Sequence, residues 1–225
     1  KNCASPIKIF ANNNNIPLLQ PENVNTQDFI KLLLKNRPDY IIVAAFGQIL
    51  HEDLLKVPLQ FCINLHSSLL PKYRGAAPIN RAILNGDSIS GVTTMIMDKE
   101  MDTGDILLTQ EIPIEKSEDA NSLHDKLSES GGDLVIKTLS RLENNDLLPV
   151  PQNSKLATYA PKLKKEESLI NWQLDANDIF NRIRGLTPWP GTHTFYSGKR
   201  LGILKGEVIP GESSDRPGYV ERITD

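Results

Sequence analysis

Cysteine is scarce in this chain, which has only Cys3 and Cys62 among its 225 residues. They form no metal-binding pair, so we expect neither a disulfide framework nor a cysteine metal site. Cys62 lies in the apolar stretch FCINLH, which predicts a buried free thiol, as in a reducing compartment. The histidines, which stand at positions 51, 66, 124 and 193, show no zinc-ligand spacing.

Long apolar runs and a strong net charge are also missing. No stretch approaches the roughly 20 apolar residues of a membrane-spanning helix, and we expect neither a signal peptide nor membrane contact. The formal net charge is −3, so a nucleic acid could be bound only by a local basic patch. These absences favour a cytoplasmic protein.

Several ligand-binding motifs are absent as well. The chain contains no GxGxxG fingerprint and no P-loop, so it shows no nucleotide-phosphate motif. Its acidic stretch MDKEMDTGD lacks the spacing and the closing glutamate of an EF-hand, which argues against calcium.

Hydrophobic residues make up 39% of the chain and charged residues 24%, which suits a packed core. Strand and helix patterns alternate through residues 1–150, and this alternation predicts an open α/β sheet. The continuous apolar run YIIVAAFG is typical of a strand buried on both faces, as in a parallel sheet. Further strands are predicted at 61–66, 91–98 and 104–114, and helices at 26–37 and 78–87.

A long amphipathic helix is predicted at residues 122–145. Gly131 and Gly132 in its middle are expected to bend or weaken it. Its expected apolar stripe contains Leu123, Leu127, Leu134, Ile136, Leu139 and Leu142.

The alternating pattern ends near residue 150, and this predicts two domains. A Pro-rich polar stretch, residues 151–165, is interpreted as a linker. Residues 166–225 then predict a smaller β-rich domain with one helix at 175–186. Tyr196-Ser197-Gly198-Lys199 in this domain is typical of a hairpin turn.

Asn64 and His66 stand two residues apart at the end of the strand FCINLH. Residues i and i+2 of a strand point the same way, so both side chains can enter one crevice beyond the strand end. An imidazole there can move a proton, and an amide can donate to a developing oxyanion. The same pair would also fit a turn cap beside a packed histidine.

The next strand is followed by three acidic candidates, Asp98, Asp102 and Asp105. Any of them could place a carboxylate near His66. Asp102 is also compatible with a plain turn, in which its side chain bonds its own backbone.

The segments NLHSSLLPKYRGAAPINRAI and GVTTMIMDKEMDTGDIL, taken in order, resemble the formyltransferase family that uses 10-formyltetrahydrofolate. PDYIIVAAFGQIL, TYAPKL and PWPGTHT extend the resemblance over nearly the whole chain. It implies a Rossmann-like, mostly parallel α/β sheet and a smaller OB-like β-barrel domain, both expected to be incomplete in this chain.

The resemblance implies transfer of a formyl group from 10-formyltetrahydrofolate to the α-amine of methionyl initiator tRNA, without a metal. Asn64, His66 and Asp102 match the family's catalytic trio. Asn64 would donate to the oxyanion, His66 would stabilise it or protonate N10 of the folate, and Asp102 would orient His66 or relay the amine proton. The implied folate-binding residues are Ser68, Leu69, Leu70, Pro71, Phe46, Gly47, Gln48, Ile49 and Leu50.

Basic residues could contact tRNA, although such residues more often lie on solvated faces. The candidates are Arg74, Lys162, Lys164, Lys165, Arg182 and Arg184. No stable protein partner is implied. Two alternatives remain open: a sister enzyme that formylates glycinamide ribonucleotide or a UDP-aminosugar, and an inactive relative that only binds folate or RNA.

Overall fold

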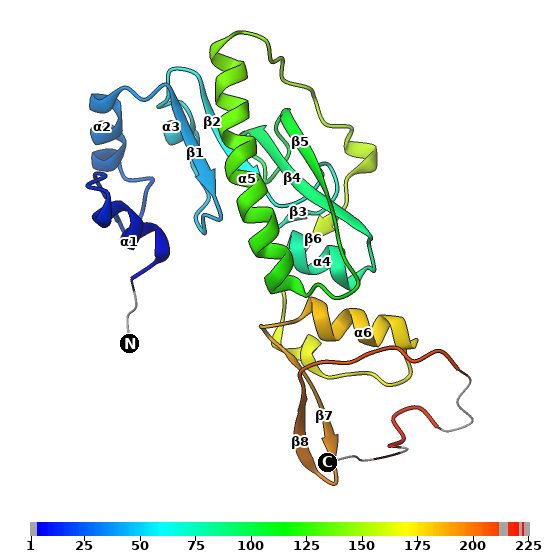
Figure 1. Ribbon diagram of the computed structural model, residues 1–225. Helices are drawn as coiled ribbons and strands as arrows, with labels where there is room; N and C mark the ends of the chain where they lie inside the picture. Colours follow the sequence, from blue (N-terminus) through cyan, green and yellow to red (C-terminus); the bar gives the residue numbers. More distant parts are fainter. Residues whose placement is uncertain (1–3, 212–215, 221, 223–225) are drawn as a thin grey trace.

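A four-stranded sheet organises the first part of the chain. The computed structural model describes residues 4–211, 216–220 and 222 (Figure 1). The strands of the sheet are β1 (Tyr40–Ala44), β2 (Phe61–His66), β4 (Ile89–Ile96) and β5 (Ile106–Pro113), in the order β1-β2-β4-β5. The helices of this part are α1 (Pro6–Asn13), α2 (Gln27–Asn36), α3 (Glu52–Leu55), α4 (Pro78–Leu84) and α5 (Ala120–Glu143).

The sheet confirms the predicted α/β class, but it is mixed within the described residues. Strands β1 and β2 are parallel, whereas β2 with β4 and β4 with β5 are antiparallel. One of the three described strand pairings is parallel, so the sheet contains parallel strands, as expected, together with antiparallel ones. Residues 97–105 join β4 directly to β5, and this loop is too short for the crossover that parallel neighbours require.

Strand β1 is half-exposed, contrary to the predicted burial on both faces. It is an edge strand of the described sheet, and Ile42 is 39% exposed. Ile41 and Val43 point the other way and pack against the cluster under α2 and α3. The strand covered on both faces is instead β4, whose residues 90–95 are all buried.

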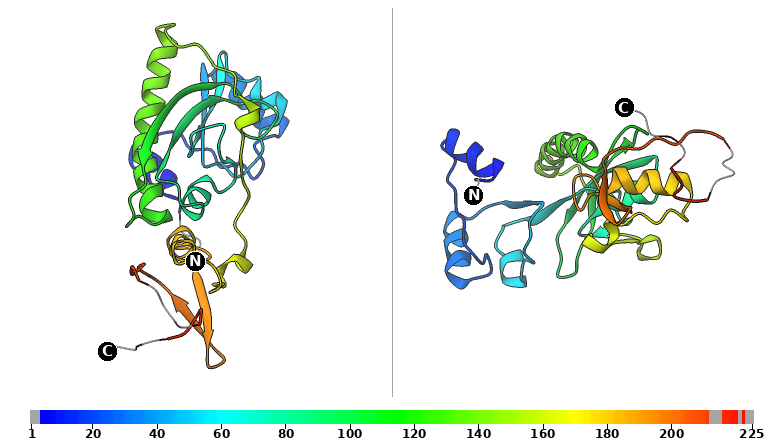
Figure 2. Two further views of the ribbon diagram at one scale, coloured as in Figure 1. Left: turned by 90° about the vertical axis from the view of Figure 1, so that its right-hand side faces the viewer. Right: turned by 90° about the horizontal axis from the view of Figure 1, so that it is seen from below.

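Helix α2 begins and ends where its sequence predicts. The Thr26 side chain accepts from the backbone N–H of Phe29, and Arg37 ends the helix in the left-handed region. Helix α5 lies on the opposite face of the sheet from α2 and α3 (Figure 2). The sheet therefore has a helical layer on each side.

Helix α5 is continuous, so the glycine pair does not break it. A Cβ on Gly131 would lie 2.7 Å from Cδ2 of Leu65, and glycine here lets α5 approach β2 closely. Leu123, Leu127 and Leu134 are buried as predicted. Ile136 is 69% exposed, because it lies out of phase with these residues on a 3.6-residue turn.

The buried face of α5 also contains a polar residue, Thr138. Thr138 is fully buried, and its Oγ1 lies 2.8 Å from Oγ1 of Thr94 on β4. Leu139 and Leu142 are half-buried.

Cys62 on β2 is buried as predicted, and burial raises the pKa of its thiol to about 11. Cys3 lies outside the described residues.

The predicted linker packs back onto the first part of the chain. Its strand β6 (Tyr159–Ala160) pairs in parallel with β3 (Arg74–Gly75), just after β2. One-turn helices η1 (Ser154–Leu156) and η2 (Lys165–Ser168) lie on either side of β6. The segment is therefore structured, and the boundaries 1–150, 151–165 and 166–225 remain predictions.

The C-terminal part has the predicted helix and hairpin. Helix α6 (Ala176–Gly185) is followed by the antiparallel strands β7 (Thr192–Tyr196) and β8 (Lys199–Ile203). Ser197 and Gly198 both have positive φ, which gives a tight hairpin turn. Within the described residues this sheet has two strands and does not close into a barrel. Helix α6 packs on α4.

Removing a buried side chain of α5 should destabilise the protein. Leu123→Ala should lower the free energy of unfolding by about 2–5 kcal/mol, since it leaves a cavity in the main core. Ile136→Ala, on the exposed face of the same helix, should change it by less than about 0.5 kcal/mol. Chemical denaturation measures both values. Equal losses would contradict the described orientation of α5.

Candidate active site

Strand β2 presents Asn64 and His66 on one face of the sheet. Leu65, between them, points to the other face and packs near Gly131 of α5. The loop between β4 and β5, residues 97–105, folds over the Asn64 face and brings Asp102 to both side chains. The structure therefore brings together the three residues of the predicted trio.

The Asp102 carboxylate is the centre of this cluster. Its Oδ2 accepts a 2.8 Å hydrogen bond from the backbone N–H of Gly75. Its Oδ1 accepts a 3.4 Å bond from Nδ2 of Asn64 and lies 3.6 Å from Nδ1 of His66. The side chain of Asp102 is 12% exposed and that of His66 is 7% exposed, so water screens the pair little. Asp98 and Asp105 make no such contacts.

Both ring nitrogens of His66 face protein atoms. Nε2 lies 2.9 Å from the carbonyl oxygen of Tyr73, to which it can only donate. Nδ1 faces Asp102, and it can donate there only when the ring is an imidazolium. This arrangement suits a residue that holds the carboxylate in place. It leaves neither nitrogen free for a leaving group.

Tyr73 fixes the carbonyl that His66 contacts. Its hydroxyl donates to Asp87 at 2.7 Å and accepts from Asn85 at 3.0 Å. Burial, aided by the bond to Asp87, raises the pKa of Tyr73 to about 12, so the hydroxyl keeps its proton near neutral pH. A protonated, anchored side chain keeps the backbone of Tyr73 in one position.

A clamp that the sequence did not reveal holds the Asp102 loop. Gln152, in the predicted linker, donates from Nε2 to the carbonyl oxygens of Asp102 (3.0 Å) and Gly104 (2.7 Å). Its Oε1 accepts from Nε and Nη2 of Arg74. No local pattern could reveal this, because the linker reaches the loop through pairings between distant segments, such as the bridge between Ile106 and Val150.

The backbone of the loop is also constrained. Asp102 has φ of 56°, in the left-handed region that favours Gly, Asn and Asp. A Cβ on Gly104 would lie 1.8 Å from the carbonyl oxygen of Ile96, so no larger residue fits there. Asp102 therefore lies in a turn, but its side chain bonds Gly75 and Asn64 and not the backbone of that turn.

The predicted folate-binding stretch Ser68–Pro71 is largely internal. Ser68 is buried, its Oγ donates to the carbonyl of Lys72, and its own carbonyl accepts from Thr93. Leu70 is buried as well. Leu69 and Pro71 are half-buried, so these two can contact a ligand while Ser68 and Leu70 shape the turn.

The other predicted folate wall, residues 46–50, follows β1 at the sheet edge where β2 also ends. Phe46, Gly47, Gln48 and Ile49 are exposed there. Leu50 is buried in the cluster under α2. The Gln48 side chain bonds the backbone of residues 22 and 24, which fixes the neighbouring segment.

The candidate RNA-binding residues divide into two groups. Lys162, Lys164 and Lys165 are exposed. Arg74 is only 4% exposed and bonds Gln152, so its guanidinium is engaged within the fold. Arg182 donates to the carbonyl of Glu167, and Arg184 donates to the carbonyls of Glu115 and Glu118. These two arginines are engaged in contacts within the fold.

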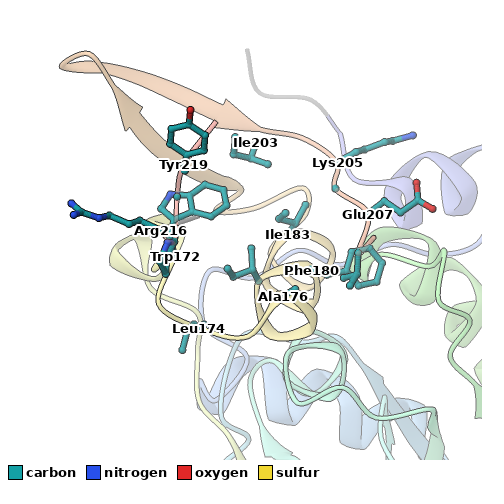
Figure 3. Close-up of a pocket in the computed structure, with 15 residues that line it drawn as sticks. Trp172, Leu174, Ala176, Phe180, Ile183, Ile203, Lys205, Glu207, Arg216 and Tyr219 are labelled. Carbon is teal, nitrogen blue, oxygen red and sulfur yellow. The ribbon is translucent and has the colours of Figure 1, made fainter. Parts of the chain in front are cut away.

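Two open pockets among the described residues lie elsewhere. Figure 3 shows the larger, about 590 Å³, where Trp172, Phe180, Ile183 and Ile203 form apolar walls in the C-terminal part. A second cavity of about 490 Å³ lies beside the β7–β8 hairpin. Neither is lined by the trio. We regard the trio as the reactive centre, because converging polar groups on a buried carboxylate provide chemistry that apolar volume does not.

Two further findings concern the described residues only. They contain no group of three His, Cys, Asp or Glu side chains that could hold a metal ion. None of their helices is long and apolar enough to cross a membrane.

Two family models match the chain. The model described as Formyl transferase matches residues 1–139, and the model described as Formyl transferase, C-terminal domain, matches residues 162–225. The methionyl-tRNA formyltransferase of Caldanaerobacter subterraneus subsp. tengcongensis is 49% identical over 222 residues, which are 98% of this chain and 72% of that protein. The same enzyme of Clostridium tetani is 48% identical over 217 residues, or 96% and 70%.

Solved structures with the same fold are more distant in sequence. HypX from Aquifex aeolicus, in complex with tetrahydrofolic acid, has a TM-score of 0.67 and 22% identity. The match covers 85% of this chain and 34% of HypX, so this chain spans about a third of that protein. The N-formyltransferase from Helicobacter canadensis, bound to folinic acid and dTDP-3-aminofucose, has a TM-score of 0.69 and 24% identity, covering 88% and 70%.

Breaking the Gln152 clamp should destabilise the protein. Gln152→Leu leaves two carbonyls and the buried Arg74 guanidinium without their partner, which should lower the free energy of unfolding by about 1–3 kcal/mol. The exposed Lys155→Ala, three residues further on, is the control. The double variant Arg74→Met/Gln152→Leu should lose less than the sum of the single losses, since the two side chains bond each other. Additive losses would contradict the coupling.

Proposed function

The chain belongs to the formyl transferase family, and we propose that it transfers the formyl group of 10-formyltetrahydrofolate to the α-amine of methionyl initiator tRNA. The acceptor is inferred from relatives named methionyl-tRNA formyltransferase, which are 43–49% identical over nearly the whole chain. The donor is inferred from the family and from the tetrahydrofolic acid bound by HypX. The cytoplasm, where initiator tRNA is used, is the proposed compartment.

One observation carries the proposal: the Asn64 amide and the His66 imidazole converge on the buried carboxylate of Asp102. A protein that only bound folate or RNA would have no need of this cluster. Formyl transfer does need it, because an uncharged carbonyl becomes an oxyanion while protons move between two nitrogens.

The reaction proceeds by addition and elimination at the formyl carbon. The amine nitrogen forms a bond to that carbon, and the carbonyl π electrons move to oxygen. The tetrahedral oxyanion then collapses, the bond from carbon to N10 breaks, and N10 takes a proton. The attacking amine loses one proton, so the overall charge is unchanged.

Asn64 is assigned to the oxyanion. One hydrogen of its Nδ2 points to Asp102 and the second remains free for the formyl oxygen. Because Asp102 accepts the first hydrogen, the amide is held in one orientation before the charge develops. Loss of a single oxyanion donor commonly slows a reaction by about 100–1,000-fold.

Asp102 is assigned to proton movement, with His66 as its positioning partner. The carboxylate can take the proton of the attacking amine, directly or through one water, and return it to N10. When its ring is an imidazolium, His66 supplies a donor to this carboxylate from Nδ1 while Nε2 stays on the Tyr73 carbonyl. This assignment differs from the expectation that His66 protonates N10, since that role would require a free ring nitrogen.

Folate is assigned to the sheet edge beside His66. Phe46, Gly47 and Ile49 are exposed there, and Leu69 and Pro71 lie just after β2. A flat pterin ring can pack on these apolar groups. The exposed Lys162, Lys164 and Lys165 are proposed to contact tRNA phosphates.

A competition assay tests the acceptor. The protein is incubated with labelled 10-formyltetrahydrofolate and a mixture of methionyl initiator tRNA, glycinamide ribonucleotide and a UDP-aminosugar. We expect label on the tRNA. Label on either small amine would favour the sister activity, and transfer to none of them, with folate still bound, would favour a binding-only relative.

Asp102→Asn should slow turnover by about 100-fold or more, the usual scale of general acid–base catalysis, because it removes the proton acceptor. Asparagine tolerates the left-handed backbone at this position, so the loop should keep its path. Folate affinity should stay within a few-fold, since a group used only in the transition state contributes little to substrate binding. Single-turnover formylation and folate titration measure the two quantities.

Asp105→Asn is the matched control, because the side chain of Asp105 belongs to the same loop but makes no contact with the trio. Near-normal turnover in Asp102→Asn would assign this residue to the turn alone. Loss of folate affinity together with turnover would instead assign it to the shape of the pocket.

A further inference from the structure

The β7–β8 hairpin separates two cavities of different character. Thr194 accepts from Trp172, and Ile203 lines the apolar cavity of Figure 3. His193, Phe195 and Arg200 face the opposite side and line the second cavity, of about 490 Å³. We name this second cavity the hairpin cavity. Its other lining residues are Lys165, Ser168, Trp189 and Pro190.

The hairpin cavity combines exposed aromatic rings with cations. Trp189 is 48% exposed and Phe195 is 60% exposed. Arg200 lies directly across the strand pair from Phe195, and both side chains line the cavity. Lys165 adds a second cation, and no carboxylate lines the cavity. Its chemistry therefore complements a ligand with a flat ring and a negative charge.

One of the lining residues, His193, has an unpaired polar atom, and the position opposite it in the hairpin is open. Gly202 stands opposite His193 in the hairpin, and a Cβ at this glycine would meet nothing within 4 Å. Nδ1 of His193 is buried and has no hydrogen-bond partner. The His193 and Phe195 rings meet edge to face with centroids 5.6 Å apart, which fixes their directions.

We propose that the hairpin cavity binds one unpaired nucleotide of the tRNA, with the base against Trp189 and Phe195 and the phosphate near Arg200 and Lys165. The proposal rests on the proposed function, which supplies the tRNA. A nucleotide carries both the ring and the charge that the lining complements, and base stacking on aromatic side chains tolerates any base. The hairpin projects beyond α6, away from the sheet, so this contact is separate from the reacting groups (Figure 1).

Fluorescence tests the stacking directly. The chain has two tryptophans, so Trp172→Phe leaves Trp189 as the only one. Methionyl initiator tRNA should quench Trp189 with the same midpoint as binding measured by anisotropy. A blunt RNA duplex, which offers phosphates but no unpaired base, should bind with little quenching. Binding of tRNA without quenching would overturn the proposal and assign the cavity to another occupant, such as a protein.

Substitutions test the contribution to affinity. Trp189→Ala and Phe195→Ala should each weaken tRNA binding by about 10-fold, the scale of one lost stacking contact. Tyr196→Ala removes an equally exposed ring from the opposite face of β7 and should change affinity by less than about two-fold. Arg200→Gln should reduce the salt slope of binding by about one. Equal effects of Trp189→Ala and Tyr196→Ala would contradict the assignment.

Further variants separate this proposal from misfolding and from the proposed function. Trp189→Tyr keeps an aromatic ring and should restore most of the affinity that Trp189→Ala loses. In formylation, Trp189→Ala should raise KM for tRNA and leave kcat unchanged, because the cavity does not touch the reacting atoms. A protein that binds tRNA with quenching but transfers no formyl group would refute the proposed function and leave this proposal intact.

Discussion

The position of the Asp102 carboxylate is the constraint on which the candidate site depends. A buried carboxylate is costly unless it is hydrogen-bonded, and here a backbone N–H and the Asn64 amide donate to it while His66 faces it. The same contacts orient Asn64 and His66, which would otherwise turn freely at the end of β2. The three residues therefore act as one unit, and the loss of any one changes the surroundings of the other two.

The segment between the two family matches helps to build this site. Gln152 holds the Asp102 loop, and Arg74 holds Gln152. Strand β6 then pairs with β3 directly after the turn that positions His66. Since α6 also packs on α4, the C-terminal part is joined to the catalytic part through several contacts.

The sequence predicted individual helices and turns better than the contacts between distant elements. Thr26 and the Ser197-Gly198 turn act through neighbouring residues, so their patterns were sufficient. The exposure of β1 depends on which elements cover it, and its apolar run could not reveal that. The trio was predicted from strand geometry and family resemblance. The Gln152 clamp and the burial of Arg74 could not be, because they depend on contacts about 50 and 80 residues apart in the chain.

A crystal structure with a stable formyl-folate analogue would test the central claim most directly. The account predicts that the formyl oxygen lies about 2.7–3.2 Å from Nδ2 of Asn64, within hydrogen-bond distance, with Asp102 facing the open side of the formyl carbon. A formyl group bound away from Asn64 and Asp102, for example in the apolar cavity between α6 and β8, would contradict it.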